Sequence, residues 1–228
     1  MEHRIGSTAV AALVFATITA THSGAQRTSS QRADGSVSSK LLRPDRTSGL
    51  TLGVYTLAVP GVSISGVDVD GTFATDFGQG AGLSVDYGIN RMFAVFASVD
   101  VAKQRTSDNT YPSGTFGLAH IEIGGRANLR TSDPNTIPYL SASVGRRGLG
   151  AQVTDDQTGR QFDMGLSGYM LAAGGGVRHF ISPSLALDGG VEIGYGSFNH
   201  LSQAGQEGDV LVNSTTSIRL RGGLSWRP

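Results

Sequence analysis

Two polar residues late in the chain, His200 and Ser202, have the types and the spacing of a base and a nucleophile. An imidazole can activate a serine hydroxyl, and alternate residues of a β-strand share one face, so the two side chains could meet. The imidazole also needs an acid to orient it. Glu207 and Asp209 follow closely, but residues 199–209 are predicted to form a loop. The simpler interpretation is a group of polar loop residues, so no catalytic residue is predicted.

His120 and Glu122 form a second pair with the chemistry of a site. An imidazole and a carboxylate two residues apart could be two ligands of a metal ion, but protein metal sites use three or four such ligands. The sequence indicates no third ligand near this pair. A hydrogen-bonded pair inside the protein is the better interpretation, and neither a metal ion nor a cofactor is predicted.

The last stretch of the chain, residues 210–226, indicates the kind of element that positions these side chains. Its alternate residues form an apolar face that includes Ile218 and Trp226 and a polar face that includes Arg219 and Arg221. This period of two is that of a β-strand, and the stretch is about three times as long as an ordinary strand of ~5–6 residues. A long amphipathic strand with an aromatic residue near its end is typical of a membrane β-barrel.

The same alternation recurs along the chain and predicts an all-β, eight-stranded antiparallel transmembrane β-barrel. The predicted strands are residues 50–59, 77–87, 92–103, 115–129, 137–146, 165–179, 185–198 and 210–226. Short connections are predicted at residues 88–91, 130–136 and 180–184, and longer polar loops at residues 60–76, 104–114, 147–164 and 199–209. Short turns on one rim and long loops on the other are typical of outer-membrane barrels.

Alternation alone does not say which face of each strand points inward. A periplasmic lipocalin-like carrier, with apolar residues inside, is the soluble alternative. The polar faces carry nearly equal numbers of acids and arginines, as a sealed interior requires, and this balance favours the membrane barrel. The last hairpin is predicted to place Glu192 opposite Arg219. The predicted interior charge network consists of Glu122, Arg126, Arg178, Asp188, Glu192, Arg219 and Arg221.

The first residues have the pattern of an export signal. A charged start precedes an apolar run at residues 9–18, and small residues surround Ala25. We expect a signal peptide over residues 1–25, because the apolar run is too short to span a bilayer. Residues 26–48 are polar and aperiodic and are predicted to be a flexible periplasmic leader. Residues 49–228 are predicted to be the barrel domain.

Composition excludes several classes of protein. The chain of 228 residues has no cysteine, which excludes a disulfide framework and cysteine-based metal or redox sites. It has 18 basic and 18 acidic residues, so no bulk positive field favours nucleic acid.

Aromatic residues fall near predicted strand ends and suggest two girdles at the headgroup levels. The predicted girdle residues are Tyr87, Phe93, Tyr139, Phe180 and Trp226 at the short-turn rim, and Phe77, Phe116, Tyr169, Tyr195 and Phe198 at the other.

With these features the chain resembles the small eight-stranded outer-membrane barrels of the OmpA transmembrane domain and OmpX-like family. The segments that carry the resemblance are residues 137–145, 174–178, 185–195 and 222–226. The resemblance implies a non-catalytic outer-membrane protein that displays surface loops and has a structural, adhesive or host-interaction role. It also implies insertion by the barrel assembly machinery, contact with outer-membrane lipid and lipopolysaccharide, and a monomer without a nucleic-acid partner.

Residues 200–205, His-Leu-Ser-Gln-Ala-Gly, are similar to the His-x-Ser-Asn-Ala-Gly motif of the PagL lipid A deacylases, which are also eight-stranded barrels. This similarity implies Ser202 as nucleophile, His200 as base and Gln203 at the oxyanion-hole position. Glutamine replaces asparagine here, and no acid lies near Ser214, where that family has its triad acid. Lipid A deacylation is therefore the alternative function, and non-catalytic surface display is the expected one.

Overall fold

The structure is a computed structural model that describes residues 47–66, 69–74, 76–105, 115–154, 161–203 and 206–228. All described residues belong to one compact unit, Arg43–Pro228. The predicted signal peptide and nearly all of the predicted leader lie outside the described residues. No helix in the described part of the chain is long and apolar enough to cross a membrane.

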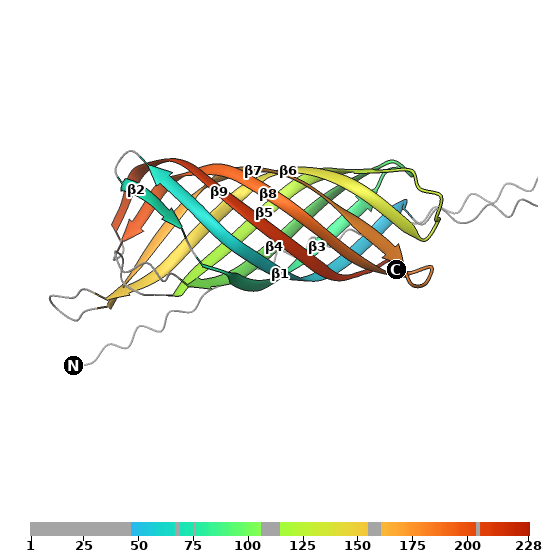
Figure 1. Cartoon of the computed structure of the whole chain (residues 1–228), viewed down its shortest axis with the longest axis horizontal. Coiled ribbons are helices and arrows are strands. Elements are labelled where there is room, and N and C mark those ends of the chain that lie inside the picture. The colour runs from blue at the N-terminus through green and yellow to red at the C-terminus, as the bar shows by residue number, and fades with distance from the viewer. Residues whose placement is uncertain (1–46, 67–68, 75, 106–114, 155–160, 204–205) are drawn as a thin grey trace, which may run out of the picture. The chain divides into compact units, whose positions relative to one another are not determined.

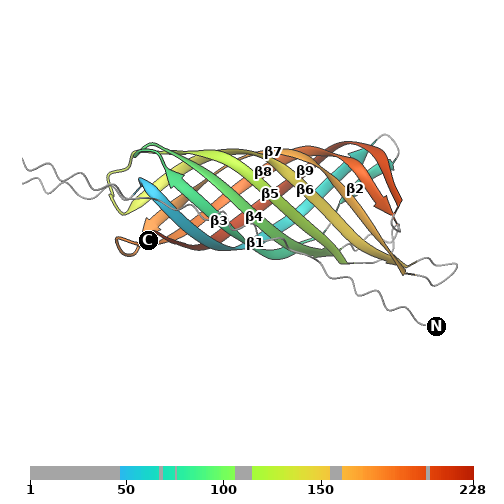
Figure 2. The ribbon, with the colours of Figure 1, turned by 180° about the vertical axis from the view of Figure 1, so that it is seen from behind.

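The described residues form one antiparallel sheet that closes on itself (Figures 1 and 2). The strands are β1 (Gly49–Gly66), β2 (Val69–Ala74), β3 (Gly78–Gly88), β4 (Phe93–Arg105), β5 (Thr115–Asn128), β6 (Thr136–Thr154), β7 (Gln161–Phe180), β8 (Leu185–Gln203) and β9 (Gln206–Trp226). β1 pairs with β9 and closes a ring of eight strands, while β2 pairs only with the second half of β1. The predicted eight-stranded antiparallel barrel is therefore confirmed.

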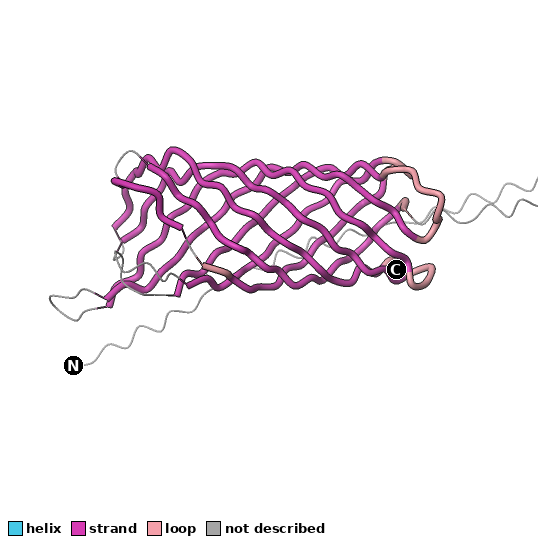
Figure 3. The backbone as a smooth tube through the Cα atoms, in the orientation of Figure 1, coloured by secondary structure: helices cyan, strands magenta, loops and turns pink. Residues whose placement is uncertain are grey.

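The predicted long loops are largely wrong. Strand pairing continues through much of three of them, so that β1 extends to Gly66, β6 to Thr154 and β8 to Gln203 (Figure 3). These segments are rich in Gly, Ser, Asp and Thr, which resemble loop residues in a sequence. Backbone hydrogen bonds hold a hairpin together without an alternating apolar face, so the pattern fades before the strand ends. We call this end of the barrel the extended end and the opposite end the short-turn end.

The short-turn end carries the connections at residues 89–92, 129–135 and 181–184. Asp133 organises the second of these turns, because its carboxylate accepts hydrogen bonds from the Thr136 hydroxyl and the Asn135 backbone amide. These two donors lower the pKa of the Asp133 carboxyl below its ordinary value. Gly49 and Trp226 also lie at this end, where β1 begins and β9 ends.

Along most of the barrel wall, apolar side chains face outward and charged side chains face inward. Leu83, Ile121 and Val191 are exposed on the outer face, while Glu122 and Arg219 are almost completely buried. Toward the extended end the interior becomes apolar. A buried cluster there, the apolar plug, consists of Leu57, Val59, Val62, Ile64, Ala102, Leu118, Leu149 and Phe198.

Six of the ten predicted girdle residues lie on the outer face, namely Phe77, Tyr87, Phe93, Tyr169, Tyr195 and Trp226. The other four were predicted wrongly. Tyr139, Phe180 and Phe198 are buried, and Phe116 packs against the apolar plug. Phe96, which interrupts the alternation of its strand, also points inward, and its ring fills the place of a side chain at Gly124.

Candidate functional site

The barrel interior nearest the short-turn end holds two arginines and two aspartates. Arg126 lies 2.7 Å from Asp86, and Arg178 lies 2.8 Å from Asp188. Arg178 also approaches Asp86 at 3.7 Å, which joins the two pairs. Tyr139 donates a hydrogen bond to Asp188, and its ring lies beneath the Arg126 guanidinium at 4.2 Å. Each charge in this tier is therefore paired, and Arg126 also lies over the Phe96 and Tyr139 rings.

The next tier is deeper and centres on Arg219, which is completely buried. The register places Glu192 directly opposite Arg219, as the sequence predicted. The Arg219 guanidinium contacts both Glu192 and Glu122. Arg221 lies 3.3 Å from Glu192 and 3.4 Å from Glu122. Ser143 donates a further hydrogen bond to Glu122. Two arginines thus share two glutamates, and this shared tier closes the middle of the barrel.

Asp100 completes a possible metal-ligand set that the sequence did not indicate. Its carboxylate accepts a 2.7 Å hydrogen bond from His120 Nδ1. Ligand atoms of Asp100, His120 and Glu122 lie within 4.8 Å of one another. Arg219 and Arg221 lie 3.4 and 3.7 Å from the Asp100 carboxylate. The two guanidinium groups already neutralise these carboxylates and would repel a metal cation. The set is therefore better described as part of the ion-pair network.

Arg147 marks the boundary between the charged interior and the apolar plug. It is buried, its guanidinium lies 4.7 Å over the Phe198 ring, and it donates a long hydrogen bond to the Thr215 carbonyl. Its Nε and Nη1 atoms have no hydrogen-bond partner, and no described carboxylate pairs with it. The sequence interpretation missed Arg147 because it assigned the residue to a loop. The alternation Ser143, Gly145, Arg147 continues the inward face and could have revealed it.

His200 and Ser202 lie in strand β8, so their assignment to a loop is wrong. A bulge between Phe198 and His200 shifts the register, and His200 then pairs with Ser167 and Ser202 with Gly165. On β9 their partners are Asp209 and Glu207. Phe198 follows the inward alternation of Glu192, and the bulge after it brings His200 and Ser202 to the outer face.

The contacts of His200 are with acids. Its Nε2 lies 3.5 Å from Glu207 and its Nδ1 lies 3.9 Å from Asp209. Both acids are largely exposed, and Ser202 has no hydrogen bond to His200 among the described contacts. An acid, a base and a hydroxyl thus share one outer face, without the serine-to-imidazole hydrogen bond of a formed triad. The side chain of Gln203 lies outside what the structure describes.

Comparison with known proteins identifies the fold. The sequence matches no known protein-family model, and no curated protein matches it. The structure is similar to Neisserial surface protein A, at 20% identity and a TM-score of 0.53, covering 79% of this chain and 98% of that one. It is also similar to the attachment invasion locus protein Ail of Yersinia pestis, at 15% identity, a TM-score of 0.50 and coverage of 78% and 99%. OprG of Pseudomonas aeruginosa matches at 12% identity, a TM-score of 0.51 and coverage of 79% and 96%. The chain has the fold of small eight-stranded outer-membrane barrels.

Proposed function

We propose that this protein is a non-catalytic β-barrel of the bacterial outer membrane that displays its extended hairpins at the cell surface. In this proposal the protein is exported by its first 25 residues, inserted by the barrel assembly machinery, and held as a monomer in outer-membrane lipid and lipopolysaccharide. Nucleic acid has no part in this function. The extended end faces outward from the cell, because the longer connections of such barrels are extracellular.

One observation carries the proposal, the inverted polarity of the barrel wall. Val191 and Ile193 are about half exposed on the outer face, whereas Glu192 between them is 5% exposed and paired inside. A soluble carrier such as a lipocalin would bury the first two and expose the third. An outer face of this kind is stable where its surroundings are hydrocarbon.

The spacing of the exposed aromatic residues supports the same location. Tyr195 pairs with Thr216, which stands ten residues before Trp226 in β9. At ~3.3 Å per residue and a strand tilt of ~40°, ten residues span about 25 Å along the barrel axis. This is the height of the apolar band of outer-membrane barrels. Tyr195 and Trp226 are thus placed to lie at the two headgroup levels.

The proposal is tested by folding the purified chain into lipid vesicles. We expect the folded barrel to migrate differently in cold and boiled SDS gels and to give no steady single-channel conductance, because charge fills its interior. Val191→Arg places a charge on the outer face and should lower the free energy of unfolding by roughly 2–4 kcal/mol. A change near zero, or a chain that is soluble and folded without detergent, would contradict a membrane location.

A second candidate function, hydrolysis of a lipid acyl ester, is supported by the outer-face group of His200, Ser202, Glu207 and Asp209. The Ser202 oxygen would attack the ester carbonyl as His200 takes its proton, and the lipid alcohol would leave with that proton as the ester bond breaks. Water would then hydrolyse the acyl-serine and release the fatty acid, with Glu207 or Asp209 orienting the imidazole. The test is mass spectrometry of lipid A from cells that express the protein. Loss of one fatty acyl chain, abolished by Ser202→Ala and by His200→Ala, would establish this function. Unchanged lipid A supports the non-catalytic proposal.

A further inference from the structure

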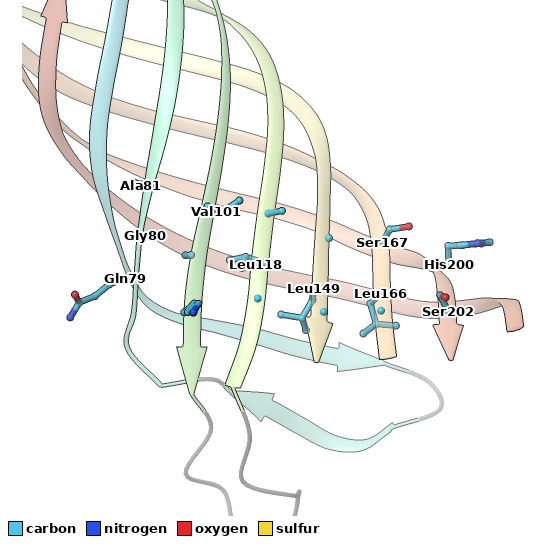
Figure 4. A pocket seen from close by; sticks show the side chains of 17 residues that line it. Gln79, Gly80, Ala81, Val101, Leu118, Leu149, Leu166, Ser167, His200 and Ser202 are labelled. Atoms are coloured by element: carbon cyan, nitrogen blue, oxygen red, sulfur yellow. The ribbon is translucent and has the colours of Figure 1, made fainter. Parts of the chain in front are cut away.

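A hollow of about 810 Å³ lies along the outer face of the barrel near the extended end, and it is lined by glycine and apolar residues together with polar residues such as His200 and Ser202 (Figure 4). The residues that line its outward side fall on two registered rows, which we call the lane. The first row is Ala81, Val101, Ala119, Gly148, Ser167 and His200. The second row is Gln79, Lys103, Gly117, Gly150, Gly165 and Ser202. The lane crosses six neighbouring strands, from β3 to β8.

The centre of the lane consists of four glycines, and packing inside the barrel does not require glycine at these positions. A Cβ atom built on Gly117, Gly148, Gly150 or Gly165 would meet nothing nearer than 3.8 Å. By contrast, a Cβ on the inward-facing Gly168 would collide with the backbone of β8. Glycine weakens a strand and often marks a place where a ligand approaches the backbone. The four lane glycines are therefore not required by packing inside the barrel, and together they leave the outer wall open between β5 and β7.

The polarity of the lane changes along its length. The first row begins with Ala81 and Val101, passes over Gly148 and ends with Ser167 and His200. The second row, one step nearer the extended end, carries Gln79 and Lys103 at its start and Ser202 at its end. Ala81 lies six residues from the lower girdle residue Tyr87, or about 15 Å along the axis, which is inside the apolar band. The other end lies beyond the upper tyrosines, because His200 follows Tyr195 in β8. The lane thus runs from the hydrocarbon into the headgroup layer, with the polarity of an amphiphile.

Cations without acidic partners border the lane. Lys103 is an outward residue of the second row, and Arg146 faces outward in the row next to the lane, where its guanidinium lies 5.4 Å over the Tyr169 ring. Among the described residues, neither cation forms an ion pair. An arginine on the lipid face costs free energy unless it reaches the interface or an anion. Lys103 and Arg146 are therefore suited to the phosphates of a lipid headgroup.

The curvature of the wall limits what can occupy the lane. Six of the eight ring strands contribute to it, so it follows more than half of the circumference. A second rigid barrel can face only a part of such a surface, whereas flexible acyl chains and a headgroup can follow it. The occupant must be amphiphilic, to match the change in polarity, and its anionic groups must bind beside Lys103 and Arg146 rather than beside Glu207 and Asp209, whose carboxylates border the lane at His200.

We propose that the lane is a binding site for one molecule of lipopolysaccharide, bound through its lipid A part. The acyl chains lie over Ala81, Val101 and Ala119, and the glycines let the sugar backbone approach the wall. Phosphate groups bind Lys103 and Arg146. This inference rests on the proposed function, because it requires that the extended end face the outer leaflet, but it does not require hydrolysis at Ser202.

The experiment fills the lane without disturbing the barrel. Gly148→Leu with Gly150→Leu places two side chains in the lane, where the backbone leaves room for them. The matched control is Gly189→Leu with Gly222→Leu, two outward and paired glycines elsewhere on the wall that have equal room. Hexa-acylated bisphosphorylated lipid A is titrated against each folded protein in detergent, and bound lipid is counted by native mass spectrometry. Phosphatidylglycerol, an anionic phospholipid, is the comparison probe.

We expect one lipid A per wild-type barrel, about tenfold weaker binding by the lane variant, and a change of less than about twofold in the control. Lys103→Gln with Arg146→Gln should also weaken binding. Equal binding by the lane variant and the control, equal binding of phosphatidylglycerol, or a change from dimer to monomer in the lane variant would overturn the proposal. Heat-shifted migration in SDS gels is measured for every variant. A folded barrel without lipid A binding refutes this inference alone, while a chain that does not fold into lipid refutes the proposed function.

Discussion

The two halves of the barrel interior are filled by opposite chemistry. Toward the short-turn end the interior holds paired charges such as Glu192 and Arg219, and the outer face is apolar. Toward the extended end the interior holds Leu118 and Phe198, while polar residues such as Lys103 lie outside. The first half has the polarity of a membrane protein and the second that of a soluble protein. The change between them lies near Arg147, and in the proposed function this is the level at which the barrel leaves the bilayer.

This difference follows from what lies outside each half. Where the surroundings are hydrocarbon, outward residues are apolar and contribute no driving force for closing the wall, so paired charges and hydrogen bonds fill the interior. Where the surroundings are water, burying apolar side chains inside the barrel is favourable. One continuous strand can serve both halves because its two faces exchange polarity along its length. β6 does so, with Ser143 inside near its start and Leu149 inside near its end.

The largest expected effect comes from breaking the charged half. Arg219→Met removes the guanidinium that contacts Glu122 and Glu192 and leaves buried carboxylates short of a partner. We expect the free energy of unfolding to fall by about 3–5 kcal/mol. The measurement is a urea titration of the barrel in lipid vesicles, followed by fluorescence of Trp226, the single tryptophan of the chain.

The partner of this change is Glu192→Ala, which should also be strongly destabilising. The double variant, Arg219→Met with Glu192→Ala, should cost much less than the sum of the two single changes, because neither charge is then left buried alone. Simple addition of the two costs would show that Arg219 depends on Glu122 and Asp100 rather than on Glu192.

A smaller effect is expected from the apolar half. Leu118→Ala removes a side chain that is 1% exposed within the apolar plug and should lower the free energy of unfolding by about 3 kcal/mol. The control is Val101→Ala on the outer face of the neighbouring strand, where the side chain is 59% exposed and the expected cost is below about 1 kcal/mol. Equal costs for both variants would mean that the plug is not packed as a core.

The contrast between the halves explains how much of the fold the sequence could predict. In the charged half the alternation is regular apart from inward aromatic residues such as Phe96, so the ring of eight strands and the pairing of Glu192 with Arg219 follow from period and register. Beyond this half the outer face consists largely of glycine and polar residues. Only the inner face then shows a pattern of apolar residues that predicts a strand. The ends of β1, β6 and β8 therefore could not be predicted from the sequence, because they begin where the polarity of the two faces changes.

Several candidate site residues were assigned to loops for the same reason. Arg147, His200 and Ser202 all lie in segments that resemble loops in the sequence but are paired strands in the structure. The bulge near Phe198 turns His200 outward, because one extra residue shifts by one position which residues face inward. A pattern of apolar and polar residues does not reveal such a shift. The acids Asp86 and Asp100 lie on inward faces that the sequence does indicate, yet their partners come from distant strands.

The smallest expected effect is at the boundary itself, where Arg147→Met makes the same substitution as Arg219→Met in a different setting. Arg147 has two unpaired nitrogens and no described carboxylate partner. Its guanidinium already packs over the Phe198 ring, and a methionine thioether can also contact an aromatic ring. Replacing a poorly paired buried charge by an apolar side chain is often neutral or stabilising, so we expect a change of less than about 1 kcal/mol in the same urea titration. A loss as large as that of Arg219→Met would show that Arg147 neutralises the acids of the charged half at a distance, and that the two halves are coupled rather than separate.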